Sequence, residues 1–186
     1  AQPTPAWLSG LNIKKFTLSQ SLLMNIQPQF PFELTALSGN IENVDLIKQK
    51  QWGIWSGKAT FNADSGTINQ VLVRRPFVEI RQSGKSSAAA SLTVSTDKGI
   101  SKIGLLVKQE PKKVPFLLRA SGSNIDLVDL NQWGWAGFPA QVIGDFDATL
   151  QGDLLAPSVA KSLNGELMAI PLQGKRLFRT VVNGVV

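Results

Sequence analysis

Histidine and cysteine are both absent from the 186-residue chain. Without them the chain has no Cys/His nucleophile, no Ser-His-Asp triad, no thiolate or imidazole zinc site and no disulfide. The phosphate-binding patterns Gly-x-x-x-x-Gly-Lys and Gly-x-Gly-x-x-Gly are missing too, and no uninterrupted apolar run approaches the ~18 residues of a membrane span. We therefore expect no enzymatic activity, no cofactor, no metal site and no membrane-crossing helix within this sequence.

Carboxylates are the remaining groups that can do catalysis or hold a metal. Asp145, Asp147 and Asp153 form the tightest acidic set. An i, i+2 pair on a strand places two carboxylates on one face, as a calcium or glycosidase site requires. A solvated sheet face also needs polar residues, and we favour that interpretation of these aspartates.

The composition and charge indicate a globular chain with a preference for anions. Hydrophobic residues make up 43% of the chain, charged residues make up 17%, and the net charge is +6. The positive charge favours lipid head groups, lipopolysaccharide or nucleic acid as partners. Our candidates for binding a head group or another anion are Arg74, Arg75, Lys175 and Arg176. Nucleic acid is disfavoured, because the aromatic residues occupy apolar repeat positions and not positions among the lysines.

An internal repeat organises the sequence. Residues 31–46 and 115–130 match without a gap at nine of sixteen positions, and a Trp-Gly pair and an alternating apolar run follow each copy. The repeat units therefore extend over about 31–64 and 115–153. Within residues 31–46 the pattern predicts a strand, a turn at Ser38-Gly39, a return strand and a short helix capped by Asp45. Repeated units of this kind build an array that presents a surface or groove.

Alternation of apolar and polar residues dominates the rest of the chain, for example over residues 88–95 and 141–151. Helix is scarce, with one helical turn expected at 157–163. We predict a mainly β fold: an elongated, twisted, largely antiparallel sheet, groove-like or taco-like, built from repeated strand-turn-strand units. Residues 1–186 are expected to form a single repetitive domain that is part of a longer protein, since the apolar pattern is still running at the last residue.

Two sets of apolar residues are candidates for a binding surface. Phe61, Ile68, Phe146, Ala148 and Leu150 are predicted to lie on the apolar face of the repeated strands, where they line a lipid groove or form ordinary core. Trp52, Trp55, Trp133 and Trp135 recur in the two units, as a carbohydrate platform, a membrane-interface anchor or a plug at each end of a groove. We favour the plug.

Three stretches carry a resemblance to a known family: residues 37–46, the strand at 57–64, and 144–153 followed by Leu163-Asn164-Gly165-Glu166-Leu167. Together they resemble the AsmA-like family of bacterial envelope proteins. The resemblance implies a periplasmic, β-rich groove anchored to the inner membrane by a helix outside this sequence. It also implies a non-enzymatic role in outer-membrane biogenesis, through transport or shielding of phospholipid or another envelope lipid, with other envelope proteins as further partners. A component of type II secretion assembly and a carbohydrate-binding β-sandwich are the alternatives.

Overall fold

A computed structural model describes residues 7–48, 51–139, 142–173 and 177–184. Its strands form one antiparallel sheet in the order β1-β2-β3-β5-β6-β7-β8-β9-β10-β11, and the short strand β4 pairs with β2 and β5. The strands are β1 (Gly10–Asn25), β2 (Phe32–Lys48), β3 (Gln51–Asn62), β4 (Ser65–Ile68), β5 (Val71–Gln82), β6 (Ser87–Ser95), β7 (Ile100–Lys108), β8 (Pro115–Asp126), β9 (Ile143–Asp153), β10 (Asn164–Pro171) and β11 (Phe178–Asn183). Two short helices, α1 (Asp129–Gln132) and α2 (Val159–Ser162), complete the described part. The predicted fold class is confirmed.

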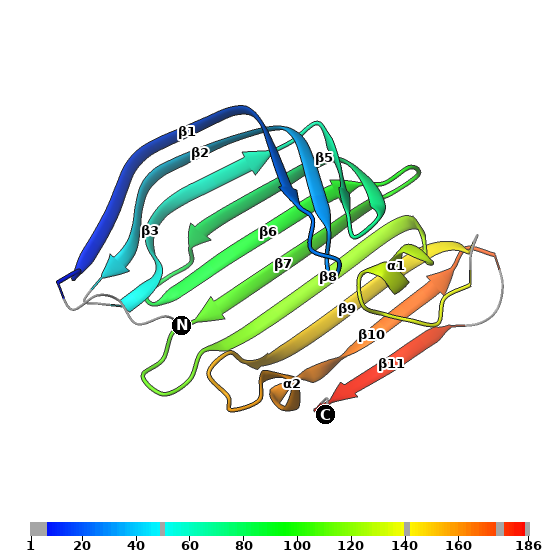
Figure 1. The fold of residues 1–186 in the computed structure, drawn as a ribbon. Coiled ribbons are helices and arrows are strands. Elements are labelled where there is room, and N and C mark those ends of the chain that lie inside the picture. The colour runs from blue at the N-terminus through cyan, green and yellow to red at the C-terminus, as the bar shows by residue number, and fades with distance from the viewer. Residues whose placement is uncertain (1–6, 49–50, 140–141, 174–176, 185–186) are drawn as a thin grey trace.

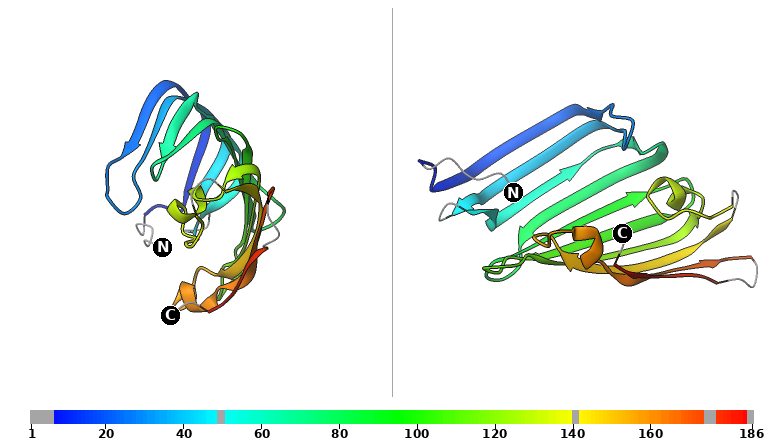
Figure 2. Two further views of the ribbon diagram at one scale, coloured as in Figure 1. Left: turned by 90° about the vertical axis from the view of Figure 1, so that its right-hand side faces the viewer. Right: turned by 60° about the horizontal axis from the view of Figure 1, so that its bottom comes forward.

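The sheet is strongly curved, with β1 and β11 at its two edges (Figure 1). Seen end on, it has the shape of an open trough, and the segment that contains α1 lies on the concave side (Figure 2, left). We call the concave side the inner face and the convex side the outer face. The ten strands of the main path, spaced about 4.8 Å apart, make the sheet roughly 45 Å across when measured along its curve.

The register of the strands places apolar residues in continuous rows across the inner face. In each row one residue from every strand of the main path is the pairing partner of the next. The first inner row is Leu18, Gly39, Phe61, Val78, Leu92, Ile103, Ala120, Ala148, Leu167 and Thr180. The second inner row is Phe16, Ile41, Ala59, Ile80, Ala90, Leu105, Leu118, Leu150, Gly165 and Val182. Among the residues of these two rows, only Thr180 has a polar side chain.

The residues between these rows point to the opposite side, because side chains alternate along a strand. This outer row is Thr17, Asn40, Thr60, Glu79, Ser91, Gly104, Arg119, Thr149, Glu166 and Val181. Cross-strand ion pairs add to it, with Lys58 Nζ 3.3 Å from Glu79 and Arg179 Nε 2.6 Å from Glu166. The sheet therefore has an apolar inner face and a largely polar outer face.

Each predicted repeat unit contains a pair of adjacent antiparallel strands, β2 with β3 and β8 with β9. In both units a glycine on the first strand pairs with a phenylalanine on the second. Gly39 is the partner of Phe61, and Gly122 is the partner of Phe146. The aromatic ring lies over the glycine in each pair and occupies the space that a Cβ atom would need.

The predicted turn at Ser38-Gly39 is wrong, because β2 runs through both residues without interruption. Gly39 is needed for the overlying Phe61 ring and not for a change of direction. Residues 32–46 therefore lie in one strand, and the strand-turn-strand unit is the longer β2–β3 pair.

The predicted helix beginning at Asp45 is also wrong. Val44 and Ile47 are both 2% exposed and three residues apart, which is a helical spacing. In the structure they belong to β2, and shifts of register on either side of Asp45 bring both onto a buried side. The carboxylate of Asp45 accepts hydrogen bonds from Asn12 and Ser56 on the two neighbouring strands, so it does not cap a helix.

Irregular register also occurs in β1 and β5. In β1 the register shifts around Ser21. In β5 a bulge at residues 74–76 gives Arg75 a φ of 49°. The helical turn near Pro157 is present as α2, whose N-cap is Ser158.

Candidate functional site

The segment between β8 and β9 folds back over the inner face, and we call residues 127–138 the strap. Leu127, Leu130 and Phe138 of the strap are buried in a core with Phe146 and Ala169 of the sheet. Asn131 closes the strap, because its amide donates to the Phe138 carbonyl at 2.8 Å and accepts from the Phe138 amide at 3.0 Å. The strap is thus a packed element with its own hydrogen bonds.

The far end of the strap is attached to the β4–β5 turn. The indole Nε1 of Trp133 donates to the carbonyl oxygen of Ile68 at 3.1 Å, and the side-chain amide of Asn69 donates to the carbonyl oxygen of Gln132. Trp133 also packs against a second core formed by Val71, Val73 and Val94. The strap therefore spans the inner face from the β9–β10 side to the β4–β5 side.

A pocket of about 410 Å³ lies between the strap and the sheet. Its lining comprises Phe30, Ile68, Leu92, Val94, Ser101, Ile103, Leu118, Ala120, Leu130, Trp133, Trp135, Phe146, Ala148 and Leu167. This volume falls within the range of ordinary small-ligand sites, about 300–1,000 Å³. None of the lining side chains is ionisable, and Ser101 supplies their one hydroxyl group.

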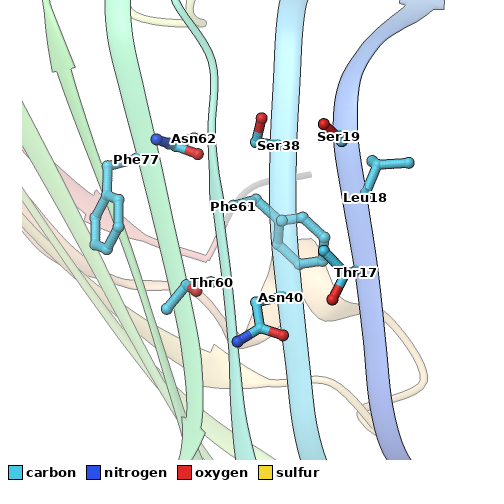
Figure 3. A pocket seen from close by; sticks show the side chains of 10 residues that line it. Thr17, Leu18, Ser19, Ser38, Asn40, Thr60, Phe61, Asn62 and Phe77 are labelled. Atoms are coloured by element: carbon cyan, nitrogen blue, oxygen red, sulfur yellow. The ribbon is translucent and has the colours of Figure 1, made fainter.

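The predicted apolar site residues all lie on or beside this face. Ile68, Phe146 and Ala148 line the pocket together. Leu150 belongs to the second inner row and lies outside the pocket. Phe61 lies farther along the sheet, where it lines a separate hollow of about 420 Å³ with Leu18 and Phe77, as well as polar neighbours (Figure 3).

Two of the four basic candidates, Arg74 and Arg75, lie within the described residues, next to each other on β5. Arg74 is exposed on the outer face, since it follows the buried Val73 along β5, and its guanidinium lies 3.7 Å from the carboxylate of Asp97. Arg75 is exposed at the β5 bulge. Lys175 and Arg176 lie outside the described residues.

The tryptophans of the two units differ in what is described. Trp133 and Trp135 line the strap pocket, and their role as a plug stays a prediction. The side chains of Trp52 and Trp55 lie outside the described part of the chain.

Two of the three candidate aspartates, Asp145 and Asp153, accept hydrogen bonds from backbone amides, and the third, Asp147, is exposed. Asp145 accepts a hydrogen bond from the amide of Asn124 at 2.9 Å, and Asp153 accepts from the amides of Val114 and Leu155 at 2.9 Å each. No group of acidic residues with the arrangement of a metal site occurs within the described ranges.

Asp129, at the start of α1, has a perturbed pKa. Partial burial raises its pKa, and the nearby carboxylate of Asp126 raises it further. Asp126 in turn accepts a hydrogen bond from the amide of Val128 at 3.3 Å. Two neighbouring carboxylates therefore stand where the chain leaves β8 for the strap, and protonation of Asp129 favours the folded strap.

Sequence reasoning missed the strap and Ser101. One signal for the strap was present: the second repeat unit has a much longer connection between its two strands than the first, and this connection is rich in tryptophan and glycine. No signal marked Ser101, because its burial depends on residues that are distant in sequence.

Comparison with known proteins identifies a relative. The chain is 33% identical over all 186 residues to the AsmA family protein YicH of Escherichia coli (strain K12). The match covers the whole of this chain and 32% of the length of that relative. No protein-family model matches the chain, and no solved structure matches it.

Proposed function

Since the chain belongs to the AsmA-like family, we propose that it is an envelope protein that supports outer-membrane assembly by shielding the acyl chains of phospholipids on its inner face. The proposal places the chain in the periplasm, with attachment to the inner membrane through a segment outside this sequence. Neither helix in the described ranges is long enough to cross a membrane. The role is non-enzymatic.

The observation that carries the proposal is the pair of apolar rows that crosses every strand of the main path. A sheet face of this kind is normally covered by a second layer. Here the strap covers only part of it, and side chains such as Ile80, Leu105 and Leu118 remain half-buried, while Phe16 is 48% exposed. An acyl chain is a suitable cover, because each methylene removed from water contributes about 0.8 kcal/mol.

The polar outer face supports the same proposal. Ion-paired lysine, arginine and glutamate side chains keep that face in water while lipid occupies the other. Head groups would then project from the open side of the trough toward solvent. The net charge of +6 favours anionic head groups.

The alternatives are less well supported. A carbohydrate-binding sandwich needs two packed sheets, whereas the described strands form one. The type II secretion component shares the repeat style, but the similarity over the whole chain is to an AsmA family protein.

Native mass spectrometry of the chain purified from the bacterial envelope, followed by lipid extraction, tests the proposal. Two adjacent residues of β7 provide matched variants: Leu105 lies in the second inner row and Leu106 is exposed on the outer face. We expect phospholipid to co-purify with the wild type and with Leu106→Glu, and to be lost from Leu105→Glu. Circular dichroism checks that both variants fold. Absence of lipid from the wild type, or equal retention by both variants, would refute the proposal.

A further inference from the structure

The strap pocket contains one buried polar group without a partner. Ser101 on β7 is 1% exposed, and its hydroxyl Oγ makes no hydrogen bond in the structure. Buried hydroxyl groups are nearly always paired, because an unpaired one loses its bonds to water without compensation. An unpaired hydroxyl group in the lining of a pocket therefore indicates a ligand atom that forms the missing hydrogen bond.

The surroundings of Ser101 offer no substitute partner. Its pairing partners on the inner face are Val94 on β6 and Gly122 on β8. The side chain of Val94 is a hydrocarbon and Gly122 has no side chain, so neither residue has a side chain that can form a hydrogen bond with Ser101. The ring of Phe146 lies over Gly122 and fills the space beyond it. Ser101 is thus a single hydroxyl within an apolar row, on the surface that faces the strap.

From this geometry we propose that the strap pocket binds an aliphatic chain that carries one neutral oxygen, a hydroxyl group or an ester carbonyl, and that this oxygen hydrogen-bonds to Ser101. The inference rests on the proposed function and adds selectivity to it. The inner face accepts any acyl chain, whereas the pocket under the strap recognises a chain by the position of its oxygen.

Charge explains why the oxygen is neutral. No lining side chain is ionisable, so a carboxylate or phosphate drawn into the pocket would lack a counter-charge. The indole N–H of Trp133, another donor at the site, is already bonded to the Ile68 carbonyl. A hydroxyl group either donates to Ser101 or accepts from it, and an ester carbonyl accepts from it. Both therefore satisfy the serine without bringing in a charge.

Three single-chain phosphocholine lipids of equal chain length test the inference: one with a plain alkyl chain, one with a single in-chain hydroxyl, and one with a single ester carbonyl. Binding to the purified chain is followed below the micelle concentration by calorimetry and by tryptophan fluorescence, since Trp133 and Trp135 line the pocket. We expect Ser101→Ala to weaken the binding of at least one oxygenated lipid about fivefold and to leave the plain lipid unchanged or tighter. The lipid that responds identifies the oxygen as hydroxyl or carbonyl.

The matched control is Ser91→Ala, which removes an exposed serine from the outer row on the neighbouring strand and should change no affinity. Ser101→Ala should fold at least as stably as the wild type, since it removes an unpaired buried group. Ser101→Cys provides a second variant, whose side chain has a similar volume but donates a weaker hydrogen bond. It should also weaken the binding of the responding oxygenated lipid relative to the plain lipid.

The outcomes separate this inference from the proposed function. If all three lipids bind and Ser101→Ala changes their affinities equally or not at all, the role of Ser101 is refuted. The proposed binding of acyl chains on the apolar inner face would then still hold. If none of the three lipids binds to the wild type, both are refuted.

Discussion

The aromatic ring of Phe146 lies over Gly122, its pairing partner on the neighbouring strand. Phe61 and Gly39 have the same relationship in the first repeat unit. In the ungapped alignment of the two copies Gly122 matches Ser38, so the glycine is offset by one residue while the pair is kept. The two units therefore share a contact that the sequence identities alone do not show.

Gly122→Ala should lower the free energy of unfolding by about 1–3 kcal/mol, because the added methyl group competes with the packed Phe146 ring. Gly104→Ala is the control, since the nearest atom to its Cβ would be the Arg119 carbonyl oxygen at 3.9 Å. Alanine there should be neutral or slightly stabilising. Chemical denaturation measures both variants, and equal effects would contradict the assigned role of Gly122.

Trp133→Phe should loosen the strap, because it removes the indole donor and leaves the Ile68 carbonyl without that bond. A loss of about 1–3 kcal/mol in the stability of the strap is expected. Hydrogen exchange should accelerate over residues 127–138 while the amides of β6, β7 and β8 stay protected. Trp135→Phe, which keeps an aromatic ring against Phe138, should have a smaller effect. Uniform acceleration over the whole sheet would contradict the assignment.

Asp129→Asn should raise the melting temperature at neutral pH. In the folded chain the pKa of Asp129 is raised above 3.8, first by burial and then by Asp126, so protonation favours the folded state. This contribution is fully present below 3.8 and is lost as the pH rises through the raised pKa. The advantage of the variant should therefore shrink as the pH falls toward 3.8.

Asp126→Asn provides the comparison for that titration. This substitution removes the smaller cause of the raised pKa of Asp129 and leaves the burial of Asp129 in place. At neutral pH it should therefore raise the melting temperature by less than Asp129→Asn does. If the rise in melting temperature caused by Asp129→Asn grew as the pH fell, the assigned direction of the pKa shift would be wrong.

Replacing Asp145 and Asp147 together by asparagine tests the non-enzymatic hypothesis. An asparagine side chain in place of Asp145 keeps an oxygen that can accept from the Asn124 amide, so the fold should persist. Complementation of a null strain should remain near the wild-type level. A large loss of function in a folded double variant would favour the calcium or glycosidase interpretation.

Period-two alternation was sufficient to predict the sheet and its apolar face. Phe61, Phe146, Ala148 and Leu150 all lie on that face because each strand keeps its alternation through the inner rows. The wrong predictions came from local sequence patterns that are compatible with two different structures. Gly39 reads as a turn residue, but the reason for it is the ring of Phe61, which becomes visible only once the register is known.

The same local sequence also adopts two structures. Val44, Asp45 and Leu46 are in a strand, whereas the matching Val128, Asp129 and Leu130 begin the strap and its helix. Asp45 is held by side chains of two neighbouring strands, and the second copy is held by Asn131, Phe138 and the contact of Trp133 with Ile68. The contacts of Asn12 with Asp45 and of Trp133 with Ile68 join residues that are distant in sequence, which is why sequence reasoning did not find the strap, its pocket or Ser101.

Site-specific photo-crosslinking in living cells tests the central claim most directly. A photoreactive residue is placed at Phe61 or Phe146 on the inner face, and at the adjacent Thr60 or Asp147 on the outer face of the same strands. We predict crosslinks to phospholipid from positions 61 and 146 and none from positions 60 and 147. Absence of lipid crosslinks from both inner positions, or equal crosslinking from the two faces, would contradict the account.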